Sequence, residues 1–365
     1  MRVFTNQPLR KCPHIAIIGP NKVGGFVLLT PLLRGLKEKY SNCTIDYFGS
    51  PLTEEFESGS RYIDWRVSAT KNLVLLKVEI QKRELIFGKY DVAINCDSFN
   101  SNTLRILTLI CSLYVVGSLE TAVFSSDLEY EIQEISLNQE WNSLDFLKRH
   151  SKYIKTNYIS EIFCRISFVD TDFTHLEVPQ KEPGFSVPDV LIHVTASRPA
   201  KQWLEEYWKI IIQWCESNNF SIGLIGSNPN TQKDLYYSKG IEENLLDSSF
   251  LVDLRGKTSL PELAGALAVT KVFVTIDTGP LHIAAAIKCR TIAVFGNNVD
   301  GIGASPIRLW GPPQAFVQFA LSKYSCSLCE EARFKNNACF LKAHYCMIHV
   351  SPNDVISQLT KILLV

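Results

Sequence analysis

The sequence has no excess of either charge and no long apolar run. Lysine and arginine together number 37, and so do aspartate and glutamate, so the formal net charge is zero. A nucleic-acid-binding chain normally carries a basic excess, so we expect no nucleic-acid partner. No stretch of 18 or more apolar residues occurs, and we therefore expect no membrane-spanning helix. The residues before Pro13 hold no apolar run long enough for a signal peptide.

The composition is that of an ordinary globular protein. Of 365 residues, 46% are hydrophobic and 20% are charged, and the length favours two domains over one. The eleven cysteines are an odd number, which argues against a secreted protein with all its cysteines in disulfides. Seven of them stand singly in apolar or strand-like surroundings, which is typical of reduced, buried thiols. We expect a cytoplasmic location, and a homo-oligomer is compatible with the sequence.

Strand and helix patterns alternate in two cycles along the chain. The apolar runs that indicate strands are residues 14–19, 44–48, 91–96, 113–116, 190–194, 221–225, 272–276 and 291–295. The helical patterns between them include residues 24–40, 203–217, 260–269 and 280–287. Strands that alternate with helices of ten or more residues predict an α/β fold with doubly wound parallel sheets.

The two cycles are separated by a segment rich in proline and charge, residues 173–188, which we interpret as a linker. We predict a first Rossmann-like domain at residues 1–178, which binds the acceptor. A second one, at residues 185–350, binds the donor and includes a cysteine-rich segment at 324–347. We expect the last residues, 351–365, to form a helix that packs back on the first domain.

The strongest chemical signal is Asp277-Thr278-Gly279-Pro280, which follows a β-branched strand and opens a helix. Proline suits the first helical turn, where its missing N–H is not needed. Thr278 and Gly279 leave backbone N–H groups free at the positive end of the helix, where phosphate binds without a metal. His282 lies in the first turn and faces the same crevice. The alternative is that Asp277 only caps the helix and that His282 only packs.

The segment DTGPLHIAAA, followed by TIAVFG, resembles the donor-binding motif of the ADP-heptose heptosyltransferases of lipopolysaccharide core and of bacterial autotransporters. Three further segments are similar to that family in the same order along the chain: GPNKVGGFVLLTPLLRGLKEKY, HVTASRPAKQWLEEYW and LRGKTSLPELAGALAVTK. The resemblance implies a GT-B fold, with two Rossmann-like domains facing a cleft. It also implies inverting transfer of heptose from ADP-heptose to a hydroxyl group.

The resemblance further implies a set of donor-binding residues, namely Thr195, Ser197, Lys201, Thr258, Asp277, Thr278, Gly279 and His282. Lys201 would neutralise the pyrophosphate. Departure of a nucleoside diphosphate develops negative charge, which a fixed ammonium and helix N–H groups can stabilise, so the chemistry needs no metal. Taken alone, Lys201 is an ordinary surface lysine.

One position departs from the family. Its opening loop normally carries a Gly-Asp pair whose aspartate takes the acceptor proton, whereas this chain has Gly24-Gly25. Another carboxylate must serve, or the enzyme is inactive. Asp97 is the candidate base because it follows the strand 91–96 on the side where ligands bind. It could equally be a turn residue or the N-cap of the next helix. Asp46 is a weaker candidate because it lies within a strand.

Four cysteines near the C-terminus form the second strong signal: Cys326, Cys329, Cys339 and Cys346. Four thiolates can hold one zinc or iron ion tetrahedrally, and an ion would help to fold a segment with little strand pattern. His344 or His349 could replace one ligand. Free thiols or disulfides are the alternative. Similar clusters occur in the autotransporter subgroup, where the implied metal is iron, so we prefer iron to zinc and a structural role.

These observations predict a heptosyltransferase whose acceptor is a lipopolysaccharide core sugar or an autotransporter serine. Gly25, the cysteine cluster and the lack of an evident basic or apolar membrane-facing stretch favour the protein acceptor. The rival interpretations are a GT-B-type sugar-nucleotide epimerase or hydrolase, and a degenerate subunit that binds the sugar nucleotide without catalysis.

Overall fold

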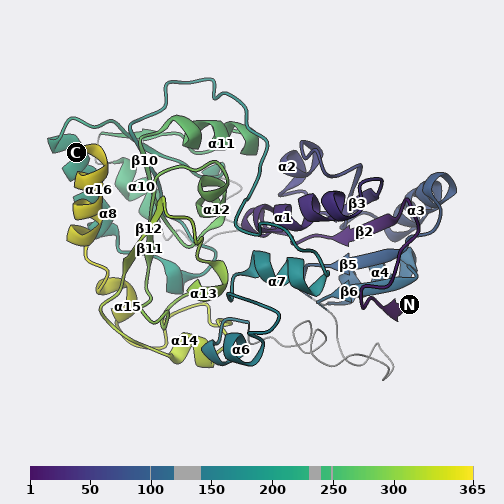
Figure 1. The fold of residues 1–365 in the computed structure, drawn as a ribbon. Coiled ribbons are helices and arrows are strands. Elements are labelled where there is room, and N and C mark those ends of the chain that lie inside the picture. Colours follow the sequence, from purple (N-terminus) through teal and green to yellow (C-terminus); the bar gives the residue numbers. More distant parts are fainter. Residues whose placement is uncertain (99, 119–140, 230–239, 248–249, 365) are drawn as a thin grey trace. The chain divides into compact units, whose positions relative to one another are not determined.

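The computed structural model describes residues 1–98, 100–118, 141–229, 240–247 and 250–364. They form two compact units, Met1–Val178 and Pro179–Val365, each built on one six-stranded sheet (Figure 1). The first unit has the bounds predicted for the first domain, and the boundary lies inside the predicted linker. None of the helices in the described ranges is long and apolar enough to cross a membrane.

The first unit has a parallel sheet in the order β1-β6-β5-β2-β3-β4. Its strands are β1 (Arg2–Val3), β2 (His14–Ile18), β3 (Thr44–Gly49), β4 (Trp65–Ser68), β5 (Val92–Asn95) and β6 (Tyr114–Gly117). Its helices are α1 (Val23–Lys39), α2 (Glu54–Ser58), α3 (Leu73–Phe87), α4 (Ser101–Ile110), α6 (Leu144–Arg149) and α7 (Ile159–Ile166). The strand order reverses between β2 and β5, so ligands are expected at the carboxyl ends of these two strands.

The second unit repeats this plan, with a parallel sheet in the order β12-β11-β10-β7-β8-β9. Its strands are β7 (Val190–His193), β8 (Ile222–Leu224), β9 (Leu251–Asp253), β10 (Val272–Ile276), β11 (Thr291–Phe295) and β12 (Val317–Leu321). The helices are a 3-10 turn (Pro199–Lys201), α8 (Glu205–Ser217), α10 (Ile241–Leu246), α11 (Leu260–Val269), α12 (Gly279–Ala286), α13 (Ile307–Trp310), α14 (Leu328–Glu331), α15 (Tyr345–Ile348) and α16 (Pro352–Leu363). Here the order reverses between β7 and β10.

The terminal helix α16 packs on α8 within the second unit, whereas we expected it to pack on the first domain. Its buried residues, Val355 and Leu359, belong to the same apolar core as Trp203 and Trp208. The indole N–H of Trp203 donates to the Val350 carbonyl at 3.0 Å, which ties the start of α8 to the chain just before α16. The apolar face that suggested a partner for this helix is covered by residues of its own unit.

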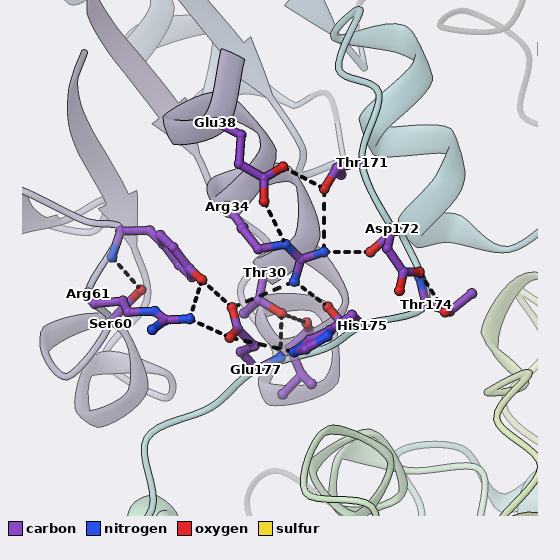
Figure 2. A network of polar contacts seen from close by, with 12 residues as sticks. Thr30, Arg34, Glu38, Ser60, Arg61, Thr171, Asp172, Thr174, His175 and Glu177 are labelled. Carbon is purple, nitrogen blue, oxygen red and sulfur yellow. Dashed lines mark hydrogen bonds and ion pairs between the residues drawn. The ribbon is translucent and has the colours of Figure 1, made fainter. Parts of the chain in front are cut away.

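The last residues of the first unit are held against α1 by the polar network of Figure 2. The Arg34 guanidinium donates to the backbone carbonyls of Asp172, at 2.5 Å, and His175, at 2.8 Å. The Thr30 hydroxyl accepts from the Glu177 backbone N–H at 3.0 Å. The Glu177 carboxylate in turn lies 2.6 Å from the Arg61 guanidinium. The polypeptide therefore leaves the first unit from a fixed position, one residue before the boundary.

A buried ionic cluster lies at the amino ends of β2 and β3. The Asp46 carboxylate accepts from His14 Nε2 at 2.8 Å, from the Tyr90 hydroxyl at 2.8 Å and from Arg83 at 2.7 and 3.0 Å. Burial alone would raise the pKa of Asp46, but the hydrogen bonds from His14 and Arg83 outweigh it and lower the pKa. Asp46 is thus fully engaged, and it lies within β3, three residues before the carboxyl end of the strand, which removes it as a candidate base.

Substituting Asn for Asp46 should destabilise the protein by about 3 kcal/mol or more, because one charge of a buried ionic cluster is lost. The native carboxyl has a lowered pKa, so its contribution is present above the unfolded-state pKa and is lost as the pH falls through the folded one. Urea denaturation at several pH values measures both effects. The variant should lose that part of the acid dependence.

The matched control is Asp170→Asn, because Asp170 forms an exposed ion pair with Arg165 at 2.7 Å. Such pairs contribute about 0–1 kcal/mol. Equal destabilisation by the two substitutions would contradict the structural role of the buried cluster.

Candidate functional site

The reversal of strand order in the second unit brings two predicted loops together. β7 and β10 are hydrogen-bonded neighbours, with His193 opposite Thr275, so the loops that follow them leave the same edge of the sheet side by side. The loop after β7 carries Thr195, Ser197 and Lys201, and the loop after β10 opens α12. Five of the eight predicted donor residues are brought together by contacts at this edge: Thr195, Lys201, Asp277, Thr278 and His282.

The N-terminus of α12 has the geometry of an anion site. Thr278 is its N-cap in an extended conformation, but no side-chain hydrogen bond caps the helix, and Gly279 and Pro280 form its first two positions. The first N–H groups of a helix have no intrahelical partner and lie at the positive end of its dipole. The alternative that Asp277 is the helix cap is therefore wrong, and the helix mouth is free of a capping side chain.

An ion pair joins the two loops. The Lys201 ammonium lies 2.8 Å from Asp277 Oδ2 and donates to the Asp277 backbone carbonyl at 3.2 Å. Asp277 Oδ2 accepts no hydrogen bond of good geometry, so its contact with the Lys201 ammonium is an ion pair without a hydrogen bond. Both side chains are largely buried, which separates Lys201 from the ordinary surface lysine of the alternative interpretation. Burial favours the neutral Asp277 carboxyl, but the Lys201 charge outweighs it and lowers the Asp277 pKa.

His282 is buried against this pair as a neutral imidazole. Burial lowers the pKa of His282 to about 4, although the Asp277 charge acts in the opposite direction. Its Nδ1 has no hydrogen-bond partner among the described residues. A buried nitrogen without a partner is costly, and this one lies in the first turn of α12. His282 can offer a hydrogen bond to a ligand, but it adds no positive charge at neutral pH.

A second histidine, His193, connects the two loops and was not predicted. Its Nε2 lies 3.4 Å from the Thr195 hydroxyl, and its Nδ1 lies 3.2 Å from the Thr278 hydroxyl. Burial lowers the pKa of His193 to about 4, so this ring is also neutral. His193 is the last residue of β7, and only the pairing of β7 with β10 places it beside Thr278. The sequence could have indicated His193 by one feature: it ends a strand, and the loop that follows carries Lys201.

Arg198 and Asn297 shape the loops around the ion pair and were also missed. The Arg198 guanidinium donates to the Ala304 carbonyl and to Asn336 Oδ1 at 2.9 Å. Asn297 is fully buried and bonds the backbone of the loop after β11 at Gly301 and Ser305.

The remaining three predicted positions take no part in these contacts. Ser197 is exposed, Thr258 is half-buried just before α11, and Gly279 contributes only backbone.

In the first unit, Asp97 lies at the reversal point between β2 and β5. It is one residue beyond Cys96, and its backbone N–H donates to Asn95 Oδ1 at 3.2 Å. Burial raises the pKa of Asp97, and no ion pair with a described residue opposes the shift. The N-cap of α4 is Asn100, which forms a full capping box with Thr103. The alternative that Asp97 caps this helix is therefore wrong.

The glycine pair that replaces the family aspartate lies inside the first turn of α1. A Cβ added at Gly25 would lie 2.5 Å from Cβ of Pro20, closer than real side chains approach. Pro20 belongs to the loop after β2, so the helix and that loop are in close contact. Gly25 is thus required by packing, and an aspartate could not be accommodated there without moving the loop.

The four C-terminal cysteines lie in one neighbourhood. Burial raises the pKa of the Cys346 thiol to about 12, and the Cys326, Cys329 and Cys339 thiols add to the shift. All eleven cysteines are free, so the disulfide alternative is not realised. Within the described ranges, no three His, Cys, Asp or Glu side chains meet at the spacing that a metal ion needs. The ligand chemistry suits zinc or iron, but the predicted metal-binding segment is not confirmed.

Comparison with known proteins gives concordant results. The model of the glycosyltransferase family 9 (heptosyltransferase) matches residues 143–332, more than half of the chain. Lipooligosaccharide heptosyltransferase 2 of Campylobacter jejuni serotype O:6 is 23% identical over 358 residues, which cover 94% of this chain and 97% of that protein. ADP-heptose lps heptosyltransferase II of E. coli has a similar structure, with a TM-score of 0.65, 17% identity and coverage of 96% and 98%.

A further solved structure, the iron-containing dodecameric glycosyltransferase TibC of enterotoxigenic E. coli H10407, has a TM-score of 0.61 and 12% identity, with coverage of 98% and 80%. At these identities both structures establish a shared fold and nothing finer. Together with the two parallel sheets, they confirm the predicted α/β class with GT-B-like neighbours.

Proposed function

This chain belongs to glycosyltransferase family 9, the heptosyltransferases, and we propose that it transfers heptose from an ADP-linked donor to a hydroxyl group with inversion at the anomeric carbon. It is an enzyme of heptosyltransferase type. The observation that carries the specific proposal is the Lys201–Asp277 ion pair beside the uncapped N-terminus of α12. All eleven cysteines are free thiols, which supports a cytoplasmic location for this activity.

The donor half of the reaction is assigned to the second unit. In transfer, the bond between the anomeric carbon and the diphosphate oxygen breaks, and the ADP oxygen takes the electron pair. The Lys201 ammonium and the backbone N–H groups of Thr278 and Gly279, at the start of α12, would stabilise that charge. Asp277 acts as a positioning residue, because it holds the ammonium at the helix mouth. The neutral His282 can bond the donor through its free Nδ1.

The acceptor half is assigned to the first unit. The acceptor oxygen attacks the anomeric carbon, and its proton passes to Asp97. A carboxylate with a raised pKa is a stronger base than an exposed one, which suits this role. The proposed acceptor is a lipopolysaccharide or lipooligosaccharide core sugar, supported by the relative that matches 94% of the chain. A serine of an autotransporter protein is the second candidate, supported by the cysteine cluster.

Replacing Lys201 with Ala should lower kcat for transfer by about 10²–10³-fold, because the leaving diphosphate loses a fixed charge. Steady-state kinetics with ADP-heptose and core oligosaccharide acceptor measure the effect. Lys209→Ala is the control, since Lys209 is a half-buried lysine of α8 that pairs with Glu205 at 2.6 Å. An undiminished rate in Lys201→Ala would refute the donor assignment.

Replacing Asp97 with Asn should lower the transfer rate by about 10²–10⁴-fold while ADP-heptose binding stays unchanged. In the wild type, the rate should rise with pH through a pKa above the ordinary aspartate value, because only the ionised carboxylate accepts the proton. The pH profile of kcat/KM checks this, and Asp97→Glu should retain partial activity.

Three outcomes decide against the mechanism. Full activity of Asp97→Asn removes the proposed base. Turnover of the donor without acceptor indicates an epimerase or hydrolase. A wild type that binds ADP-heptose but transfers to neither acceptor is a degenerate binding subunit.

We also propose that Cys326, Cys329, Cys339 and Cys346 bind one structural metal ion, iron in preference to zinc. The shared neighbourhood of the thiols supports this. Elemental analysis of protein purified without oxygen should find about one ion per chain, and Cys326→Ser with Cys329→Ser should lose it. Cys215→Ser, at a buried single thiol, is the control. Wild-type protein without iron or zinc would contradict the proposal.

A further inference from the structure

Helix α3 of the first unit is apolar on the side that faces water. Its buried residues, Leu76 and Ile80, pack into the core beneath it. The opposite side carries Val74, Leu85 and Ile86, which are 71%, 86% and 69% exposed, with Leu75 and Val78 also exposed. Val78 lies three and four residues after Leu75 and Val74 and seven and eight residues before Leu85 and Ile86, so the five positions form one stripe along the helix. A surface helix normally presents a polar face to water, and a contiguous apolar stripe marks an interaction site.

The helix cannot turn this stripe inward. Arg83, on the buried side, binds the Asp46 carboxylate through two nitrogens, at 2.7 and 3.0 Å. Rotation of α3 would break this contact and expose Leu76 and Ile80 in exchange. The outward position of the apolar stripe is thus fixed by the buried ionic cluster.

Basic side chains accompany the stripe. Residues 71–89 hold five basic and two acidic side chains, in a chain whose overall charge is zero. Lys71 pairs with Glu79, and Arg83 pairs with Asp46. Lys77, Lys82 and Lys89 are exposed and form no ion pair with a described residue. Their charge is available to an anionic partner along the apolar face.

We propose that α3 binds the surface of an anionic lipid bilayer, lying in the interface with its stripe among the acyl chains. An apolar face flanked by lysines is the pattern of a helix that lies in a membrane interface. Lys82 lies within the stripe, next to Val78 and Ile86 by helical spacing. At a bilayer its ammonium can reach the headgroups while its stem stays apolar. A symmetric contact between two copies of α3 would bring identical lysines together, which is unfavourable.

The stripe begins at the edge of the sheet that carries Asp97. Asn72 caps α3 four residues after the end of β4, and the Asn102 side chain donates to the Ala69 carbonyl at 3.4 Å, joining the start of α4 to this loop. If the proposed function holds, bilayer binding brings this edge to a lipid-anchored acceptor. We expected no evident basic or apolar membrane-facing stretch, and this proposal departs from that expectation.

Flotation of the full chain with vesicles tests the proposal without donor or acceptor. The wild type should float with vesicles of phosphatidylcholine containing phosphatidylglycerol, and less with phosphatidylcholine alone. Val74→Glu and Leu85→Glu should each weaken binding by more than about tenfold, since an apolar contact is lost and a negative charge is added. Lys77→Gln and Lys82→Gln should each weaken binding by about fivefold at low salt.

Val269→Glu is the matched control, because Val269 is 65% exposed on α11 of the second unit. It should float like the wild type. Since all these side chains are exposed, circular dichroism and thermal melting should remain unchanged. A wild type that does not float, or variants that float equally well, would overturn the proposal. The proposal would also be overturned if light scattering showed a dimer that Val74→Glu abolishes. That result would assign the stripe to a contact with a second copy of the chain.

Vesicle binding and heptose transfer can fail independently. Protein that floats but transfers no heptose would support the lipid-binding surface and contradict the proposed function. Protein that transfers to a soluble core oligosaccharide but does not float keeps the function and loses the surface.

Discussion

The proposed chemistry of the second unit depends on the contact between Lys201 and Asp277. It joins two loops that are far apart in the sequence, and only the reversal of strand order between β7 and β10 allows them to meet. Without the ammonium, Asp277 would place an uncompensated charge in a buried site, at a cost of about 3–5 kcal/mol. That charge would also repel a diphosphate. With the ammonium, the mouth of α12 can attract an anion, and in the proposed mechanism a diphosphate would compete with Asp277 for the same cation.

Much of this plan could be predicted because it depends on local patterns. β10, β11 and α11 have the predicted bounds, since continuous apolar runs and the Ser259 capping position mark their ends. The strands β1, β4, β9 and β12 were not predicted, because their sequences contain no continuous apolar run. His193 was missed for a different reason. Its contacts with Thr195 and Thr278 depend on the register between two strands about 80 residues apart, which no local pattern reveals.

Two other helices show that an apolar pattern can be satisfied in more than one way. The helix at the C-terminus was expected on the first domain, but Val355 and Leu359 complete the core of its own unit. The pattern of α3 is apolar around most of its circumference, which does not tell a buried helix from one with an exposed apolar stripe. The structure decides between them through Arg83, whose bond to Asp46 fixes the side that faces the core. Long-range ionic contacts of this kind cannot be inferred from periodicity.

Gly25, the cysteine cluster and α3 each bear on whether the acceptor is a protein or a glycolipid. Gly25 was taken to favour a protein acceptor, but its close contact with Pro20 explains the glycine by packing alone, so it carries no information about the acceptor. The cysteine cluster belongs to the second unit, and the acceptor half is assigned to the first. α3 belongs to the first unit, and its exposed apolar and basic face begins at the edge that carries Asp97. A protein acceptor gives no reason for such a face, whereas a sugar anchored in an anionic bilayer requires the enzyme to work at that surface. If α3 binds a bilayer as proposed, its exposed face favours the glycolipid as the acceptor.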